Sequence, residues 1–221
     1  MEALFLYGVN CTESVWEGFI PLLPSWNCEI ISYPHDVTKS TLCLTDLTKW
    51  VYSRVKNKKY DVIVGHSLGG LIALELTSSY SLLCDKIICL DTNLRPAGSF
   101  FRNLMTEEHT KQFGERMSTM MAAELPYYTA DFMNSLQKDF DYTPMLSKIE
   151  APVYLLLGDR GQPNAYNHIC DLNLPPQALN KLHIEFVADS CHMPMIENPE
   201  KLAKILIAIC SWPYTNGTET A

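Results

Sequence analysis

The chain alternates short apolar runs with longer amphipathic stretches, and this alternation limits its possible folds more than any other feature. The short runs are rich in β-branched and aromatic residues, and they are apolar almost throughout rather than at every second position. Such runs are typical of strands buried on both faces, in a parallel sheet covered by helices. The predicted strands are residues 3–7, 29–33, 61–64, 86–90, 153–157 and 183–187. The sequence therefore predicts an α/β fold with a mostly parallel sheet.

Helices are predicted between these strands, at residues 13–23, 42–56, 68–80 and 199–212. The second of them places Leu44, Leu47, Val51 and Val55 on one face, which is the spacing of an amphipathic helix. Pro199 suits the first turn of the last helix. A chain of 221 residues can form one domain with a sizeable core.

One long segment departs from the alternation of predicted strands and helices. Residues 91–152 separate two predicted strands, whereas a crossover needs only about a dozen residues. The segment contains two further predicted helices, at 107–124 and 129–140. Since open α/β sheets bind ligands at the carboxyl ends of their strands, we predict a helical cap over a site there. Helices packed on the flank of the sheet are the alternative. The predicted boundaries are a core at 1–93 and 149–214, a cap insertion at 94–148 and a flexible tail at 215–221.

Composition and charge exclude several classes of partner. A hydrophobic fraction of 47% is that of a folded globular protein, and a net charge of −8 argues against binding to nucleic acid. No stretch reaches the ~18 apolar residues of a membrane span. Glu2 stands where a signal peptide would carry basic residues. We therefore expect a cytoplasmic protein with neither a nucleic-acid nor a membrane partner.

The eight cysteines are scattered along the chain. They form no CxxC pair and no Cys/His cluster at zinc spacing, and several lie inside apolar runs. We interpret them as buried free thiols in a reducing compartment, and we expect no metal site.

The sharpest local motif is Gly65-His66-Ser67-Leu68-Gly69, directly after an apolar run and directly before a helical one. A serine raised on a tight strand-to-helix turn needs neighbours without side chains, so that strand and helix can pass closely. The turn also places Ser67 at a helix N-terminus, where free N–H groups stabilise negative charge. The alternative is an ordinary turn that uses Gly and Ser.

A serine hydroxyl needs a base to become a nucleophile. His192 stands just past the end of the last predicted strand, at the sheet edge where Ser67 also emerges. We therefore expect His192 to be the base. The other histidines are expected to be surface or structurally satisfied residues: His35, His66, His109, His168 and His183.

Four stretches, taken in order, resemble the α/β-hydrolase superfamily, in the branch with a helical cap after the sixth strand of an eight-stranded sheet. They are LFLYGVN for the oxyanion loop, VIVGHSLGGLIAL for the nucleophile elbow, SKIEAPVYLLLGDRG for the acid strand, and ADSCHMPMIENPEKLAKIL for the histidine loop. The resemblance implies an oxyanion hole formed by the backbone N–H groups of Val9 and Leu68. Tyr7 replaces the histidine that usually precedes the oxyanion-loop glycine.

The resemblance also implies an acid that holds the histidine. In the family it commonly lies two or three residues past the glycine that ends its strand, and Gly161 occupies the second of these positions. We therefore expect Asp159 to be the acid. Asp91, at the end of the preceding predicted strand, is the alternative.

These residues predict a serine hydrolase of the esterase or thioesterase class (EC 3.1), which cleaves a small acyl substrate through an acyl-enzyme and needs no cofactor. The protein is expected to be a monomer or a homodimer. One alternative is a carbon–carbon bond hydrolase or lyase, with Arg95 or Arg102 binding a substrate carboxylate. Leu71 stands where the related menaquinone-pathway lyase has Arg, which argues against that particular enzyme. Another alternative is a hydrolase-like binding protein with little turnover.

Overall fold

A computed structural model describes residues 1–137 and 139–211 of the chain. The described residues form one six-stranded sheet in the order β2-β1-β3-β4-β5-β6, and every neighbouring pair is parallel. The strands are β1 (Glu2–Leu6), β2 (Asn27–Ile30), β3 (Tyr60–His66), β4 (Cys84–Leu90), β5 (Val153–Gly158) and β6 (Leu182–Val187). All six overlap the predicted strands, so the predicted α/β fold is confirmed, with a sheet that is wholly rather than mostly parallel. The resemblance implied eight strands, and the described residues contain six.

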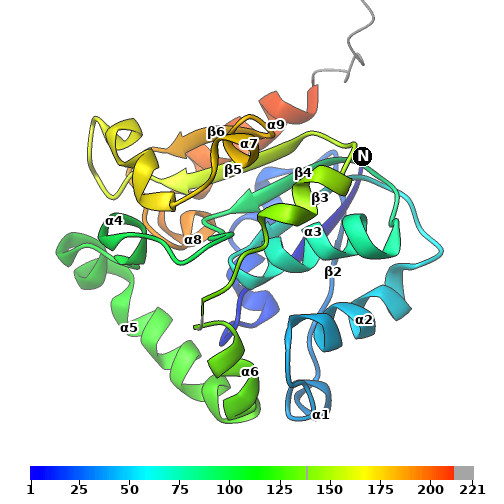
Figure 1. Ribbon diagram of the computed structural model, residues 1–221. Helices are drawn as coiled ribbons and strands as arrows, with labels where there is room; N and C mark the ends of the chain where they lie inside the picture. Colours follow the sequence, from blue (N-terminus) through cyan, green and yellow to red (C-terminus); the bar gives the residue numbers. More distant parts are fainter. Residues whose placement is uncertain (138, 212–221) are drawn as a thin grey trace, which may run out of the picture.

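Helices cover both faces of this sheet (Figure 1). Helices α2 (Leu44–Val55) and α3 (Leu68–Tyr80) contact each other on one face, and α9 (Pro199–Ser211) packs with the segment after β1 on the other. Most residues of the central strands are buried, as expected of apolar runs in a covered parallel sheet. The predicted positions of these helices are confirmed. The last residue of the predicted C-terminal helix and the tail at 215–221 lie outside the described residues.

The predicted helix at 13–23 is wrong. The structure has two short 3₁₀ turns there, η1 (Glu13–Trp16) and η2 (Ile20–Leu22). Pro21 cannot donate the backbone hydrogen bond that would continue an α-helix, and Gly18 has low helix propensity. Trp16 is nevertheless buried against Phe5, with ring centroids 5.1 Å apart, so the apolar side chains still enter the core.

The segment predicted as a cap lies between β4 and β5, on the side of the sheet to which the β4 arrow points (Figure 1). It contains α4 (Ser99–Arg102), α5 (Glu107–Glu124), η3 (Leu125–Tyr127), α6 (Ala130–Ser135) and η4 (Thr143–Lys148). The predicted helix at 107–124 is confirmed. The one predicted at 129–140 is shorter than expected, because α6 ends at Ser135. A short helix, α8 (Pro194–Glu197), precedes α9.

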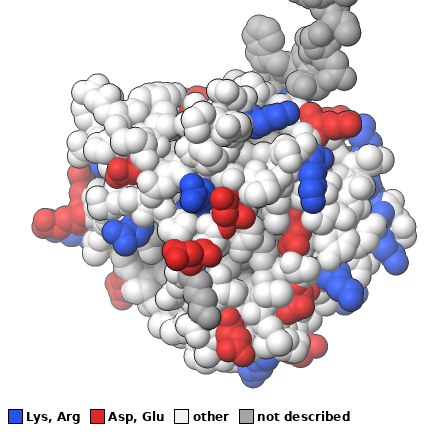
Figure 2. Space-filling view, in the orientation of Figure 1, with Lys and Arg blue, Asp and Glu red and all other residues white. Residues whose placement is uncertain are grey.

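The cysteines are free thiols, and the surface carries charges of both signs (Figure 2). All eight cysteines are free, but only Cys11, Cys89 and Cys191 are fully buried, so the prediction of buried thiols is wrong for the exposed Cys170. Acidic and basic side chains are interspersed on the face shown in Figure 2. None of the helices described here is both long enough and apolar enough to cross a membrane.

Candidate active site

Ser67 occupies a strained turn between β3 and α3. Its φ of 52° and ψ of −116° lie in a region that residues with a side chain rarely adopt. Two bonds to the neighbouring strand hold the turn, because the Ser67 N–H donates to the Leu90 carbonyl at 2.8 Å and Thr92 Oγ1 donates to the Ser67 carbonyl at 3.0 Å. The serine is thus fixed at the carboxyl edge of the sheet.

The glycines beside Ser67 allow strand and helix to approach closely. A Cβ added to Gly65 would overlap the backbone of Gly69, and a Cβ added to Gly69 would overlap the carbonyl of Leu6. The space is therefore sufficient for glycine alone, which confirms the steric interpretation of the motif.

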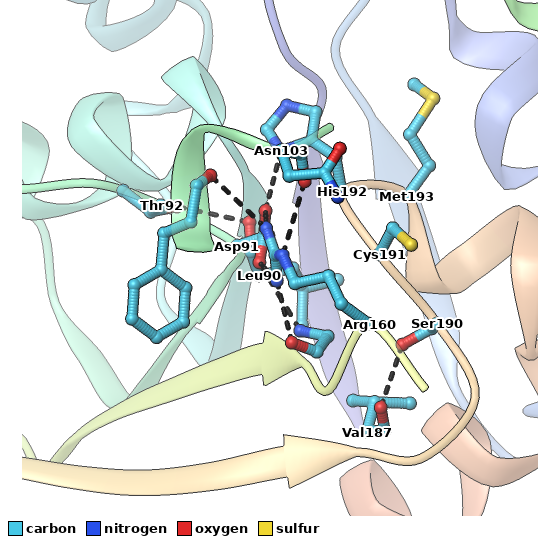
Figure 3. A network of polar contacts seen from close by, with 12 residues as sticks. Leu90, Asp91, Thr92, Asn103, Arg160, Val187, Ser190, Cys191, His192 and Met193 are labelled. Atoms are coloured by element: carbon cyan, nitrogen blue, oxygen red, sulfur yellow. Dashed lines mark hydrogen bonds and ion pairs between the residues drawn. The ribbon is translucent and has the colours of Figure 1, made fainter. Parts of the chain in front are cut away.

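His192 lies after β6 and is held by a carboxylate at the end of β4. Its Nδ1 is 2.7 Å from Asp91 Oδ2, in an arrangement visible in Figure 3. The Asp91 side chain is 2% exposed and that of His192 is 19% exposed, so the histidine reaches solvent while the acid does not. This is the arrangement that fixes the tautomer of a catalytic histidine.

The expectation that Asp159 holds His192 is wrong. Asp159 Oδ1 instead accepts a hydrogen bond from the Gly161 N–H at 2.9 Å, within its own loop. The physical reason is the turn that follows β5. Arg160 there has a φ of 52°, and its side chain, not that of Asp159, is directed into the protein. The alternative acid, Asp91, is the residue that contacts His192.

Arg160 is the important residue that the sequence analysis missed. Its NH1 and NH2 donate to the two carboxylate oxygens of Asp91, each at 2.9 Å, in a buried bidentate pair. Burial alone would raise the pKa of Asp91, but the Arg160 guanidinium and the hydrogen bond from His192 hold that pKa well below its ordinary value. Asp91 therefore remains ionised although it is enclosed.

His66 contacts the backbone of the loop that carries His192. It is fully buried, and its Nε2 lies 2.9 Å from the His192 carbonyl oxygen. Burial, with a smaller contribution from the neighbouring His192, lowers the pKa of His66 from 6.5 to about 3. His66 is therefore neutral and donates its Nε2 hydrogen to this carbonyl.

The remaining histidines have other neighbours. His35 stacks on Tyr127, His168 on Phe100 and His183 on Tyr154. His109 is buried and lies beside Cys191, with Nδ1 and Sγ 3.5 Å apart. None of these four lines the cavity that contains Ser67.

Ser67, Asp91 and His192 line one cavity of about 440 Å³, which is in the range of small-molecule sites. Val9 and Leu68 also line it, and Leu68 is the first residue of α3, where N–H groups have no partner within the helix. The cavity is lined by Val9, Ser67, Leu68, Leu71, Asp91, Asn93, Phe101, Arg102, Leu104, Met133, Leu136, Gln137, Phe140, Tyr142 and His192. The segment between β4 and β5 thus supplies much of its apolar wall. Among the described residues no hydrogen bond joins the Ser67 and His192 side chains, a bond that often tightens only with substrate.

Tyr7 holds the loop that carries Val9. The Tyr33 N–H donates to the Tyr7 hydroxyl at 2.5 Å, and the Tyr33 hydroxyl donates to the Tyr7 carbonyl at 3.3 Å. Both side chains are buried. Tyr7 therefore connects the loop that carries Val9 to the segment after β2.

One group of described side chains has the composition of a metal site. Atoms of His109, Cys191 and Glu197 lie within 4.8 Å of one another. Glu197 Oε2 also accepts the N–H groups of Cys191 and Met193 at 2.7 and 3.0 Å. The carboxylate thereby fixes the loop on both sides of His192.

Comparison with known proteins shows the family and the fold. Residues 18–205 match the alpha/beta hydrolase family. A Haemophilus influenzae protein, provisionally named 2-succinyl-6-hydroxy-2,4-cyclohexadiene-1-carboxylate synthase, is 35% identical over 81 residues. That match covers 34% of this chain and only 32% of the relative's length.

Two solved structures show the same fold at low identity. MenH from S. aureus has a TM-score of 0.72 at 12% identity, over 96% of this chain and 93% of its own. A thermophilic esterase from Thermogutta terrifontis has a TM-score of 0.70 at 15% identity, over 96% and 89%. The family match spans most of the sequence, and the fold and the serine turn agree with it. The chain belongs to the alpha/beta hydrolase family.

Proposed function

We propose that the chain is a serine hydrolase that cleaves small esters or thioesters through Ser67, His192 and Asp91. The observation that carries this proposal is the 2.7 Å contact between His192 Nδ1 and Asp91 in a cavity that Ser67 also lines. With Nδ1–H donated to the carboxylate, the Nε2 lone pair of His192 remains available to accept a proton.

The reaction would follow the acyl-enzyme route. Ser67 Oγ attacks the substrate carbonyl carbon while His192 takes the hydroxyl proton, and His192 then protonates the departing alcohol or thiol. The backbone N–H groups of Val9 and Leu68 would stabilise the oxyanion, and one such donor contributes roughly 3 kcal/mol to the transition state. Water, deprotonated by His192, then attacks the acyl carbonyl; the bond to Ser67 Oγ breaks, His192 returns the proton to Oγ, and the acid is released.

The cavity favours a modest acyl group. Its walls include Phe101, Met133 and Leu136, and its volume of about 440 Å³ suits a small molecule rather than a polymer. An apolar acyl chain would gain roughly 0.8 kcal/mol per buried methylene there.

Hydrolysis of p-nitrophenyl esters and acyl thioesters of two to eight carbons tests the proposal. We expect turnover by the wild type and a loss of kcat by several orders of magnitude in Ser67→Ala. Ser53→Ala, an exposed serine on α2, is the matched control and should behave as the wild type. A fluorophosphonate probe should label the wild type and the control but not Ser67→Ala. Near-normal turnover by Ser67→Ala would exclude this mechanism, and resistance to the probe would favour a binding protein.

The second candidate function is carbon–carbon bond cleavage or elimination, catalysed by the same three residues. It is favoured by the sequence match to the Haemophilus influenzae protein named as a cyclohexadiene-carboxylate synthase, and by Arg102 at the cavity. Leu71, which also lines the cavity, argues against it, because the related lyase has Arg there. Formation of the product named for that relative, together with inactivity on the ester panel, would decide for this candidate.

A further inference from the structure

Arg160 stands at the position where the acid of this family is commonly found. It lies two residues past Gly158, the glycine that ends β5, while the carboxylate that holds His192 comes from the end of β4. An arginine and an aspartate that follow adjacent strands thus form a buried ion pair at this edge of the sheet.

The guanidinium is fixed from several sides. Besides its two bonds to Asp91, NH1 donates to the Gly158 carbonyl at 2.6 Å, and NH2 donates to the Phe101 carbonyl at 3.3 Å. Nε donates to the Asn103 carbonyl at 3.3 Å, and the group lies 5.3 Å from the Phe101 ring centre (Figure 3). A planar fork held in this way allows the Asp91 carboxylate one orientation.

Asp91 distributes its oxygens between two partners. Oδ1 accepts from Arg160 and, at 3.3 Å, from the Gly158 N–H, while Oδ2 accepts from Arg160 and from His192. The oxygen that faces His192 is therefore already bound to a cation. Arg160 compensates the buried negative charge that would otherwise attract a proton to the pair.

Other titratable groups surround the pair. The ring of His66 lies 4.8 Å from that of His192 and is neutral. Burial raises the pKa of the Cys191 thiol and that of the Glu197 carboxyl, and Arg102 lines the cavity beyond them. Arg160 is the cation in direct contact with Asp91.

We propose that Arg160 is a positioning residue of the reaction: it fixes the carboxylate that holds His192, and its charge opposes protonation of the Asp91–His192 pair. This inference rests on the proposed hydrolase function for its kinetic part. Without the guanidinium, the pair would carry a buried net negative charge and would take up a proton at higher pH, whichever of the two residues received it.

The pH profile of kcat/KM distinguishes the effect of the Arg160 charge from that of its hydrogen-bonding geometry. In Arg160→Gln, we expect the acid limb to move to higher pH by about one unit or more, and kcat to fall by about 10- to 100-fold, with KM within about twofold. Arg160→Lys keeps the charge but loses the fork, so its acid limb should stay near that of the wild type while kcat falls. Arg54→Gln, an exposed arginine on α2, is the matched control and should change neither quantity.

Nitrogen-15 NMR of the His192 ring gives a readout that does not need turnover. We expect the midpoint of the His192 titration to move upward in Arg160→Gln and to return in Arg160→Lys. An unchanged acid limb of kcat/KM and an unchanged His192 titration in Arg160→Gln would overturn the inference. If Arg160→Gln does not fold, Arg160→Lys decides: an upward shift of its acid limb and of its His192 titration by about one unit, relative to the wild type, would overturn the inference. A wild type inactive on every ester, but with the expected NMR shifts, would contradict the hydrolase proposal and leave the action of Arg160 intact.

Discussion

His192 takes its Nδ1 partner from Asp91 at the end of β4, 2.7 Å away, and not from the loop that follows β5. Ser67 follows β3, Asp91 follows β4, Arg160 follows β5 and His192 follows β6. These four strands are consecutive neighbours in the sheet. A parallel sheet brings all their carboxyl ends to one edge, which is why residues so distant in the sequence converge there.

The first prediction concerns the acid. Asp91→Asn should lower kcat by about 10³- to 10⁴-fold, because an amide at this position favours the wrong tautomer of the histidine. Asp159→Asn should leave kcat unchanged, since its carboxylate serves only the loop of Gly161. Steady-state kinetics on the best ester of the panel compares the two variants. A large loss in Asp159→Asn with normal turnover in Asp91→Asn would reverse the assignment.

The strands and the serine turn could be predicted because their signals are local. Each buried strand is a continuous apolar run, and the spacing of Gly65 and Gly69 follows from the steric demands of one turn. The same reasoning failed for residues 13–23, where the apolar pattern suggested a helix but Gly18 and Pro21 do not favour one.

The choice of acid depends on contacts between distant segments. Asp91 and Asp159 both follow strands, and the sequence alone does not show which side chain turns inward. Arg160 decides this, because its buried fork requires a carboxylate partner and Asp91 lies opposite. Arg160 lies far from Asp91 in the sequence, so their pairing could be seen only in the structure.

The second prediction concerns stability in acid. The pKa of His66 falls from 6.5 in the unfolded chain to about 3 in the folded protein. Between these values the unfolded state binds a proton that the folded state does not, so this group lowers the free energy of unfolding as the pH falls, by roughly 1.4 kcal/mol per unit. In His66→Gln, which keeps a donor for the His192 carbonyl, unfolding should depend less on pH between 6 and 4.

Urea denaturation at several pH values measures this difference. The plots of unfolding free energy against pH should diverge, with the shallower slope in His66→Gln. Parallel plots for the two proteins would show that His66 is not the source of the acid sensitivity.

The third prediction concerns the serine turn. Gly69→Ala should prevent folding or destabilise the protein by several kcal/mol, because the new Cβ would overlap the Leu6 backbone, which cannot move without displacing β1. Gly18→Ala is the matched control, since nothing lies within 4 Å of a Cβ there. Thermal unfolding followed by circular dichroism compares them. A normal melting temperature for Gly69→Ala would contradict the close packing of β1 against α3.

The fourth prediction concerns the oxyanion loop. In Tyr7→Phe the ring can still pack on Tyr33, at a centroid distance of 4.3 Å, but the buried Tyr33 N–H loses its acceptor. The expected cost is about 1–3 kcal/mol of unfolding free energy. Because Val9 follows in the same loop, kcat should also fall, by up to about tenfold, with KM little changed.

Tyr52→Phe is the control, since the Tyr52 hydroxyl makes no hydrogen bond among the described residues and its ring pairs with Tyr80. Chemical denaturation and ester kinetics on both variants test the prediction, and equal behaviour of the two would show that the Tyr7 hydroxyl does not support the loop.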